Sequence, residues 1–514
     1  MLHWSVYFIL FKQGGVMIII KKFKVLSLSN PLIVGLPLLV LLGLTCLSGF
    51  AQTTVNVSSL AELRLAVQDS NQHIIMKPGN YTITELPGQS RNFLCSGNNN
   101  IIEMTGVYIK FPVGEANGAY FRLTGNGITF KGGEFEDVYK NGMTEVTDFG
   151  SYNQDRENLA KGQKGGALFT VPGNNIRIEG MKLTARGSFP YGYGNIYGIG
   201  GKNAAGLDKR CGLLIHGKNV TIDGCEFQHQ AFGHVIYMGE GFDKILIKNT
   251  LIEGRVRPSN DLYSETNDGD LPRSFDYKVQ FDVLEGLSIP RDKMLNLTED
   301  GIRAYPGKGE VTVENCTIKK CRSGIKLYMT SGKAIARNCT VLDCIVEGYS
   351  MPSDGEVINC RGNAAYGPLI YIHPADNFYK VEAAHRSNIE IELLPSTHAV
   401  GNHVMAAIRG TNNIFKLTQT ESPIDANLRP IVVGYYSRFE LLTTDFPDVP
   451  EGYEENYEKN KVSYEAKGNT IINETEYPVI LGELSEHNNI TSYGKITDYG
   501  KNNATLSIKE LPGH

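Results

Sequence analysis

The sequence predicts an all-β chain wound as a solenoid, and three observations support this prediction. The 514 residues include 56 glycines, a high count for a helical protein. Short runs in which apolar and polar residues alternate, the period of a β-strand, recur along the chain and end on Gly or Asn. Three such runs end on Asn315, Asn338 and Asn359, so the repeat is 23 and then 21 residues long. A period near this length, with about three short strands per unit, is typical of a solenoid.

Residues 1–51 differ from this pattern and are expected to direct export. Met17 is a possible second start, and a basic stretch, an apolar run over 31–44 and mostly small residues at 48–51 follow it. This order is that of a secretory signal peptide, and the apolar run is short for a membrane span. We therefore expect cleavage before Gln52 and a bacterial protein that is secreted or periplasmic, with no membrane segment after cleavage.

The charge of the mature chain narrows the class of partner. The whole chain carries 50 basic and 55 acidic residues, a net charge of −5. Four lysines lie in the signal segment, which contains no acid, so 46 basic residues remain against 55 acidic ones and the net charge becomes −9. An acidic surface argues against nucleic acid as the partner, but it is compatible with a local cationic cleft that binds a polyanion.

One short helix is expected first, followed by strands. Ser59 and Glu62 fit the Ser-x-x-Glu capping box, and apolar residues from Leu60 to Val67 share one face. The alternating runs that predict strands lie at 127–133, 175–180, 219–224, 244–249, 310–315, 334–338 and 356–359, and less regularly after about 375 at 388–393, 412–417, 468–473 and 488–491.

Two ladders of identical residues support the stacking of coils. Asn249, Asn315, Asn338 and Asn359 are expected to turn inward and bond the backbone of neighbouring turns. Cys225, Cys316, Cys339 and Cys360 form the next column, and Cys321 and Cys344 form a second column of cysteines. Disulfides or zinc would need paired spacings, whereas coils place these residues in a row about 4.8 Å apart. We therefore expect buried free thiols.

With these repeats the chain resembles the right-handed parallel β-helix proteins, the fold of pectate lyases, chondroitinase-B-like and alginate lyases and several glycoside hydrolases. The resemblance covers the chain from about Val55 to the end. It implies one catalytic domain over 52–514, a right-handed parallel β-helix whose N-terminal coil is capped by the helix. The glycine content then needs no further domain.

A second repeated phrase, Gly followed by alternating residues, predicts the face that carries function. In Gly324-Ile325-Lys326-Leu327-Tyr328 the apolar residues are expected to point inward and Lys326 and Tyr328 outward. Applied to every coil, this register predicts two outward columns. Two residues after Gly it gives Tyr120, Leu168, Leu214, Val235, Arg303, Lys326, Ser350 and Leu369, and four residues after Gly it gives Arg122, Thr170, His216, Tyr237, Tyr305, Tyr328, Pro352 and Tyr371.

Three long excursions are expected to rise over this face. Gly233 and Gly301 are 68 residues apart, but an excursion of 44 residues over 255–298 leaves 24, one coil, so their coils should be adjacent. Excursions over 136–165 and 186–210 enter at the same register. Loops inserted at one corner of a solenoid lie on one side, so loops and columns would form a cleft.

The residues of this cleft suit β-elimination on a uronate. The reaction needs the carboxylate neutralised, a base for the C5 proton and an acid for the departing O4. We predict Arg303 as neutraliser, Lys326 as base and Tyr328 or Tyr305 as acid, because a Lys beside a second cation has a lowered pKa. His216, Tyr237, Tyr371 and His373 are expected to line substrate subsites, and the loop residues Arg273, Tyr277, Lys278 and Arg291 could reach over the cleft. His234, at an inward position, is read as a core histidine.

These residues predict a secreted lyase that cleaves a uronate-containing anionic polysaccharide, with alginate favoured by the Lys, Tyr and Arg set. The Asn-Thr-Tyr-Arg-type motif of chondroitinase-B-like alginate lyases is missing and Arg303 precedes Lys326, which implies a different β-helix lyase family. A glycoside hydrolase using Glu299 and Asp300 is the main alternative, and a sugar-binding solenoid or adhesin is the second. The sequence leaves the oligomeric state open.

No metal or other cofactor is required by the predicted reaction. Asp268, Asp270, Glu299 and Asp300 are the candidates for Ca²⁺, although the run around Asp268 is also typical of a surface turn.

Overall fold

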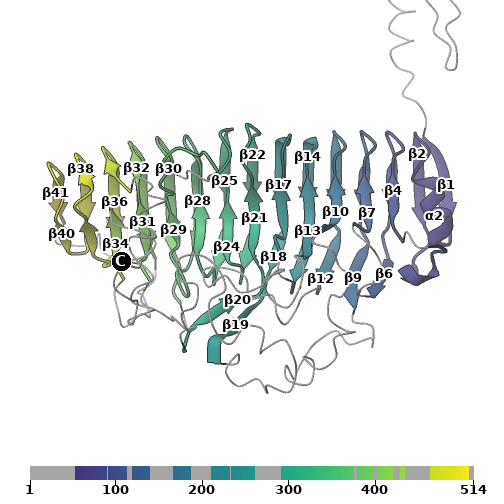
Figure 1. Cartoon of the computed structure of the whole chain (residues 1–514), viewed down its shortest axis with the longest axis horizontal. Helices are drawn as coiled ribbons and strands as arrows, with labels where there is room; N and C mark the ends of the chain where they lie inside the picture. Colours follow the sequence, from purple (N-terminus) through teal and green to yellow (C-terminus); the bar gives the residue numbers. More distant parts are fainter. Residues whose placement is uncertain are drawn as a thin grey trace, which may run out of the picture. The chain divides into compact units, whose positions relative to one another are not determined.

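The computed structural model describes residues 52–88, 91–112, 119–138, 166–186, 210–231, 233–260, 291–375, 379–396, 403–420, 429–434 and 464–508. Within these ranges the strands form two long parallel sheets, one of 23 strands and one of 13, whose members pair from coil to coil (Figure 1). The predicted parallel β-helix is confirmed.

The 13-stranded sheet takes one strand from each coil. Its strands are β4 (Phe93–Cys95), β7 (Phe121–Leu123), β10 (Gly166–Val171), β13 (Arg210–Ile215), β16 (Ile236–Met238), β21 (Asp300–Ala304), β24 (Ser323–Lys326), β27 (Glu347–Ser350), β29 (Ile370–Tyr371), β31 (Ala406–Ile408), β34 (Ile431–Val433), β37 (Val479–Leu481) and β40 (Ile496–Asp498).

The 23-stranded sheet takes the remaining strands of each coil, and every run predicted from the sequence lies in it. Its strands are β1 (Thr53–Val57), β2 (Gln72–Met76), β3 (Gly79–Thr82), β5 (Ile101–Glu103), β6 (Val107–Pro112), β8 (Thr129–Lys131), β9 (Glu134–Val138), β11 (Ile176–Glu179), β12 (Lys182–Ala185), β14 (Lys218–Asp223), β15 (Glu226–His229), β17 (Asp243–Lys248), β18 (Leu251–Glu253), β22 (Val311–Glu314), β23 (Thr317–Lys319), β25 (Ala334–Arg337), β26 (Thr340–Leu342), β28 (Glu356–Gly362), β30 (Asn388–Leu393), β33 (Ile414–Gln419), β36 (Thr470–Glu474), β39 (Asn489–Ser492) and β41 (Ala504–Ser507). A small third sheet holds β32 (Gly410–Thr411), β35 (Ala466–Lys467) and β38 (Ser485–Glu486).

The predicted helix is present as α2 (Leu60–Ala66), which packs on β1, β2 and β4. The Ser59 hydroxyl accepts from the Glu62 backbone N–H at 3.2 Å. The Glu62 carboxylate accepts from the Ser58 backbone N–H, one residue earlier than a standard capping box. A short 3-10 helix, η1 (Ile83–Glu85), follows β3. Within the described ranges no helix has the length and apolar character needed to cross a membrane.

The core fills the inside of the coils. Apolar side chains of equivalent positions stack from coil to coil, as Phe93, Phe121 and Phe169 do with ring centroids 4.6 and 4.8 Å apart. These rings are fully buried. The alternation seen in the sequence therefore comes from one face of each strand lying in this core.

The cysteine prediction is confirmed for the described residues. Cys225, Cys316, Cys339 and Cys360 are buried and free, as are Cys321 and Cys344. Thr250 fills the column on the coil between Cys225 and Cys316, because the backbones of Leu251 and Thr317 bond to Cys225 and Thr250. The column thus holds small residues that match the narrow corner of the coil.

The asparagine prediction is wrong in direction. Asn249, Asn315, Asn338 and Asn359 adopt positive φ of 51–54° at a corner. The Asn249 and Asn315 side chains are exposed and bonded to each other rather than to buried backbone, with Asn315 Nδ2 3.3 Å from Asn249 Oδ1. The left-handed corner favours Asn and turns its side chain outward. Inward asparagines occur elsewhere, as in Asn413 and Asn469, where a buried amide oxygen accepts a backbone N–H at 2.9 Å.

The membership of the two predicted columns is also wrong, because strand pairing mixes residues from both. Strand pairing places in a single outward column Leu94, Arg122, Thr170, Leu214, Tyr237, Arg303, Lys326 and Ser350. Tyr371 follows Ile370, the partner of Tyr349, and so continues it. The column takes the second residue after Gly in some coils and the fourth in others. A slip of two residues keeps each side chain on its face, so alternation cannot detect it.

The glycine before Arg303 and the one before Lys326 are required for space. A Cβ on Gly301 would lie 2.5 Å from Ile318 Cγ2, and one on Gly324 would lie 2.4 Å from Val341 Cγ1. Core side chains of the other sheet therefore approach the backbone where these two strands begin.

The excursions leave from equivalent strands, as predicted. They follow β9, β12 and β18, which belong to one series of paired strands together with β15. The third begins and ends as an antiparallel ribbon of β19 (Val256–Pro258) and β20 (Met294–Asn296), which lies beside the stack of coils in Figure 1. Its return brings β16 against β21, so the coils of Gly233 and Gly301 are adjacent, as predicted. Residues 139–165, 187–209 and 261–290 lie outside the described ranges.

Candidate active site

Arg303 and Lys326 are neighbours on paired strands, as the sequence predicts, but both are buried. Two carboxylates that the prediction did not give to this reaction accompany them. Asp300 and Glu347 are both fully buried and flank Ser323 in the strand pairing of β21, β24 and β27. The site therefore consists of two cations, Arg303 and Lys326, and the two buried carboxylates of Asp300 and Glu347 on the same group of paired strands.

Asp300 holds the arginine side of the site. It accepts hydrogen bonds from Arg303 Nη1 at 2.7 Å and from Arg322 Nε and Nη2 at 2.9 and 2.8 Å. Burial alone would raise the pKa of Asp300, but Arg322 and Arg303 outweigh it and hold that pKa well below its ordinary value. Asp300 in turn keeps the pKa of Arg303 above its ordinary value despite burial. Both groups are charged at neutral pH.

Glu347 holds the lysine side. Its Oε1 pairs with Lys326 Nζ and accepts the Ser323 hydroxyl at 2.9 Å, and its Oε2 lies 3.0 Å from His373 Nε2. Burial lowers the pKa of Lys326, and the attraction of Glu347 opposes that shift without cancelling it. Burial also lowers the pKa of His373 to about 4, so this ring is neutral at pH 7.

Aromatic rings form two groups around these charges. Tyr305 packs against Tyr237 and His234, and its hydroxyl lies 3.0 Å from His234 Nε2. Tyr328 stacks flat on His373, with centroids 3.7 Å apart, and Tyr371 meets the same ring edge-on. Burial raises the pKa of Tyr305 to about 12, so its hydroxyl keeps its proton.

The structure brings together seven of the eight predicted site residues. These are Arg303, Tyr305, Lys326, Tyr328, Tyr237, Tyr371 and His373. His216 is set apart from them, because Leu214 and not His216 pairs with Tyr237. The His216 side chain is exposed, its ring lies beside Gly239, and its Nδ1 lies 3.0 Å from the Glu240 carbonyl. Its role in a substrate subsite stays a prediction.

His234 was read as a core histidine, and it is buried, but it belongs to this site. Arg322, Glu347 and Asp300 were not assigned to the predicted elimination. A usable signal existed, since Asp300, Ser323 and Glu347 each precede the strand glycine of their coil. Of the loop candidates, Arg291 is exposed, and Arg273, Tyr277 and Lys278 lie outside the described residues.

Among the residues that the structure describes, no cluster of three or more His, Cys, Asp or Glu could hold an ion. Glu299 and Asp300, two of the calcium candidates, are bonded to Arg322. Asp268 and Asp270 lie outside the described residues.

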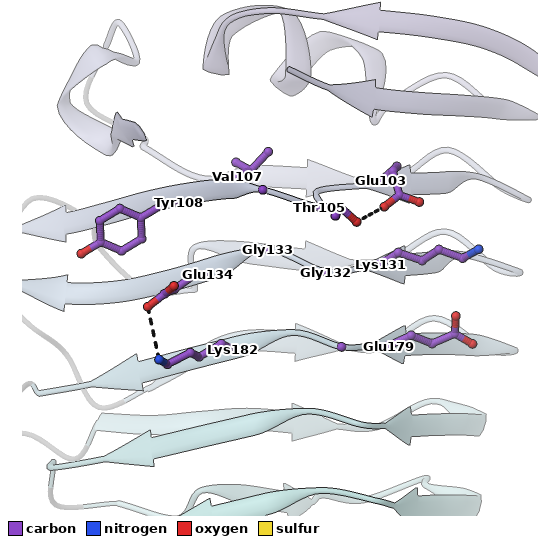
Figure 2. A pocket seen from close by; sticks show the side chains of 12 residues that line it. Glu103, Thr105, Val107, Tyr108, Lys131, Gly132, Gly133, Glu134, Glu179 and Lys182 are labelled. Carbon is purple, nitrogen blue, oxygen red and sulfur yellow. Dashed lines mark hydrogen bonds and ion pairs between the residues drawn. The ribbon is translucent and has the colours of Figure 1, made fainter. Parts of the chain in front are cut away.

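A separate shallow groove of about 600 Å³ crosses three coils near the N-terminal end (Figure 2). Gly132 and Gly133 line it together with charged side chains of the three coils. Figure 2 shows Lys182 directed at Glu134, and their charged atoms are 3.5 Å apart. Because none of the predicted site residues lines it, this groove is distinct from the charged site.

Comparison with known proteins places the fold. A family model described as a right-handed β-helix region matches residues 195–350. The search of curated proteins gave no match. Among solved structures the chain is similar to the catalytic domain of a GH87 α-1,3-glucanase variant in complex with nigerose, at 10% identity and TM-score 0.40, over 90% of this chain and 69% of that one.

Two further structures carry other activities in their names. The A-module of a mannuronan C-5 epimerase from Azotobacter vinelandii is 9% identical, with TM-score 0.39, over 90% of this chain and 99% of that one. An alginate lyase complex is 12% identical, with TM-score 0.38, over 88% and 89% of the two chains. At these identities and TM-scores the similarities do not assign an activity. The chain has a right-handed β-helix fold.

Proposed function

We propose that this protein is an exported polysaccharide lyase that cleaves a uronate-containing polysaccharide, alginate first, by β-elimination. The observation that carries the proposal is Lys326. Its ammonium is desolvated, its pKa is lowered, and it lies beside Arg303 and over the ring of Tyr328, 5.6 Å from the centroid. A lysine whose pKa is lowered, beside a fixed cation, suits proton removal next to a carboxylate.

In the proposed reaction Arg303 neutralises a charge, and Lys326 and Tyr305 each transfer one proton. Arg303 attracts the uronate carboxylate, which makes the C5 proton acidic. Lys326 Nζ takes that proton, the C4–C5 double bond forms, and the bond from C4 to O4 breaks. Tyr305 gives its proton to O4, a role that its partial exposure favours over the buried Tyr328. His234 Nε2, 3.0 Å from the Tyr305 hydroxyl, orients it, and after product release Lys326 gives its proton to water and Tyr305 takes one from water.

Elimination is favoured over hydrolysis by the state of the carboxylates. A glycoside hydrolase needs an acid and a base that reach the scissile bond. Glu299 and Asp300 are 2% and 0% exposed, and Arg322 bonds both. A carboxylate with a pKa held well below its ordinary value is a poor proton donor.

The test is to incubate the protein without residues 1–51 with alginate, pectate and glycosaminoglycans and to follow the absorbance of unsaturated uronates. We expect a rise, and we expect EDTA to leave the rate unchanged because the reaction as proposed needs no cofactor. New reducing ends without that absorbance would replace elimination by hydrolysis. Neither product would leave a carbohydrate-binding role.

The first mutational prediction concerns the base. Lys326→Ala should lower kcat by about 10² to 10⁴, the usual contribution of a general base. Lys182→Ala, which removes an exposed charge at the separate groove, should leave kcat near the wild-type value. Full activity of the Lys326 variant would remove Lys326 from the mechanism.

A further inference from the structure

We infer that Glu347 is a positioning residue that holds Lys326 and His373 at once, one with each carboxylate oxygen, and so aligns the base with the Tyr328 ring. The inference rests on the proposed function in taking Lys326 as the base. Glu347 is fully buried, so it acts through its partners and does not touch the substrate.

The contacts of Glu347 leave each partner one orientation. Oε1 is shared by Lys326 Nζ and the Ser323 hydroxyl, which fixes the end of the lysine side chain on β24. Oε2 lies 3.0 Å from His373 Nε2. Since a carboxylate only accepts, Nε2 carries the proton of the neutral ring and Nδ1 is left as an acceptor.

The His373 ring, held by Glu347, packs against two tyrosine rings and so fixes their positions. Its ring lies flat on Tyr328, with an angle of 3° between the planes, and Tyr371 packs on it at 4.6 Å. Rotation of the His373 ring about its Cβ–Cγ bond would break both the hydrogen bond to Glu347 and the packing on Tyr328 and Tyr371. The buried Glu347 carboxylate therefore links Lys326 on β24 to His373, which follows β29 and packs on the tyrosines.

Glu347 also sets the charge balance at Lys326. Burial lowers the pKa of Lys326 most, and Arg303 and Arg322 lower it further, whereas Glu347 and Asp300 raise it. Among the described residues, His373 and Tyr328 are two further titratable groups close to the ammonium. Removal of the Glu347 charge would therefore move the lysine titration to lower pH.

The decisive experiment measures that titration without substrate. Lys326 is labelled with acetic anhydride at a series of pH values, and its peptide is quantified by mass spectrometry in the wild type and in Glu347→Gln. We expect the labelling midpoint to fall by about one pH unit. On polyuronate, the acidic limb of kcat/KM should move the same way, and kcat should fall by about 10² from misalignment while KM changes little.

The outcomes separate this inference from the proposed function. An unchanged midpoint in folded Glu347→Gln overturns the positioning role, even if the variant is inactive. A shifted midpoint in a protein that cleaves no polyuronate leaves the positioning role intact and removes the lyase. If Glu347→Gln does not fold, Glu347→Asp is used instead. Its carboxylate is one methylene further from Lys326, so the labelling midpoint of Lys326 should fall by a smaller amount. An unchanged midpoint there also overturns the inference.

Discussion

At the scale of single residues, buried charge holds the outer face of the coils together. Asp137 is fully buried and accepts from the Tyr120 hydroxyl at 2.7 Å and from Arg210 Nη2 and Nε at 2.8 and 3.1 Å. Its backbone carbonyl accepts from Arg186 Nη1 at 2.6 Å. Because Asp137, Arg186 and Arg210 stand at the ends of described segments that flank 139–165 and 187–209, this network ties the bases of two excursions.

Asp137→Asn should destabilise the fold by about 3–5 kcal/mol, because it leaves the Arg210 guanidinium buried without its counter-charge. The midpoint of guanidinium unfolding measures the loss. Glu179→Gln is the matched control, since its partner Arg177 is half exposed and such pairs contribute at most about 1 kcal/mol. Equal losses in the two variants would argue against a special role for burial.

The same scale shows what the sequence could and could not predict. Lys326 and Arg303 were found because a cation on the outward side of an alternating strand is conspicuous. Glu347 and Asp300 gave only the weaker signal of their shared position before a strand glycine, because a carboxylate before a glycine is also common in surface turns. Their importance comes from burial and from the arginine and lysine opposite them, which only the three-dimensional packing supplies.

At the scale of strands, the glycines mark where the two sheets approach each other. Gly324→Ala should destabilise by about 1–3 kcal/mol through overpacking, because its Cβ would meet Val341 and the Gly348 carbonyl at 2.4 and 2.5 Å. Gly180→Ala is the comparison: nothing lies within 4 Å of its Cβ, but its φ is +63°, so only the backbone cost of about 1 kcal/mol applies. Unfolding midpoints of the two variants test the order, and a larger loss at Gly180 would contradict it.

Strand register was the element-level property that the sequence predicted least well. The identity of the strands follows from alternation, and the adjacency of the Gly233 and Gly301 coils follows from the repeat length. The pairing of Tyr237 with Arg303 instead of Tyr305 depends on where each coil turns, and a shift of two residues leaves the hydrophobic pattern unchanged. The free cysteine column was predictable because small buried residues at a constant spacing need no register finer than one coil.

At the scale of the whole molecule, several histidines are largely buried and neutral. Burial lowers the pKa of His229 and of His373 to about 4 and that of His403 to about 3, the last with help from the nearby Arg429 charge. Burial lowers the pKa of His234 as well, against the pull of Glu299 and Asp300. His229 and His234 are close enough for the charge of one to affect the other, whereas His373 and His403 belong to later coils.

Because the pKa values of these histidines are lowered, we predict that the free energy of unfolding decreases in mild acid. A histidine whose pKa is depressed on folding contributes fully above its ordinary value of 6.5, and that stability is lost as pH falls toward the folded pKa, since the unfolded chain takes up the proton first. Each such histidine should cost about 1.4 kcal/mol per pH unit between about 6.5 and 4. The midpoint of unfolding by guanidinium should therefore be constant above pH 7 and fall steadily below it.

His229→Gln should reduce the dependence of that midpoint on pH by the share of one histidine, whereas His216→Gln, at an exposed position, should not change it. A level profile down to pH 4 would mean that these rings protonate without cost, which their burial forbids.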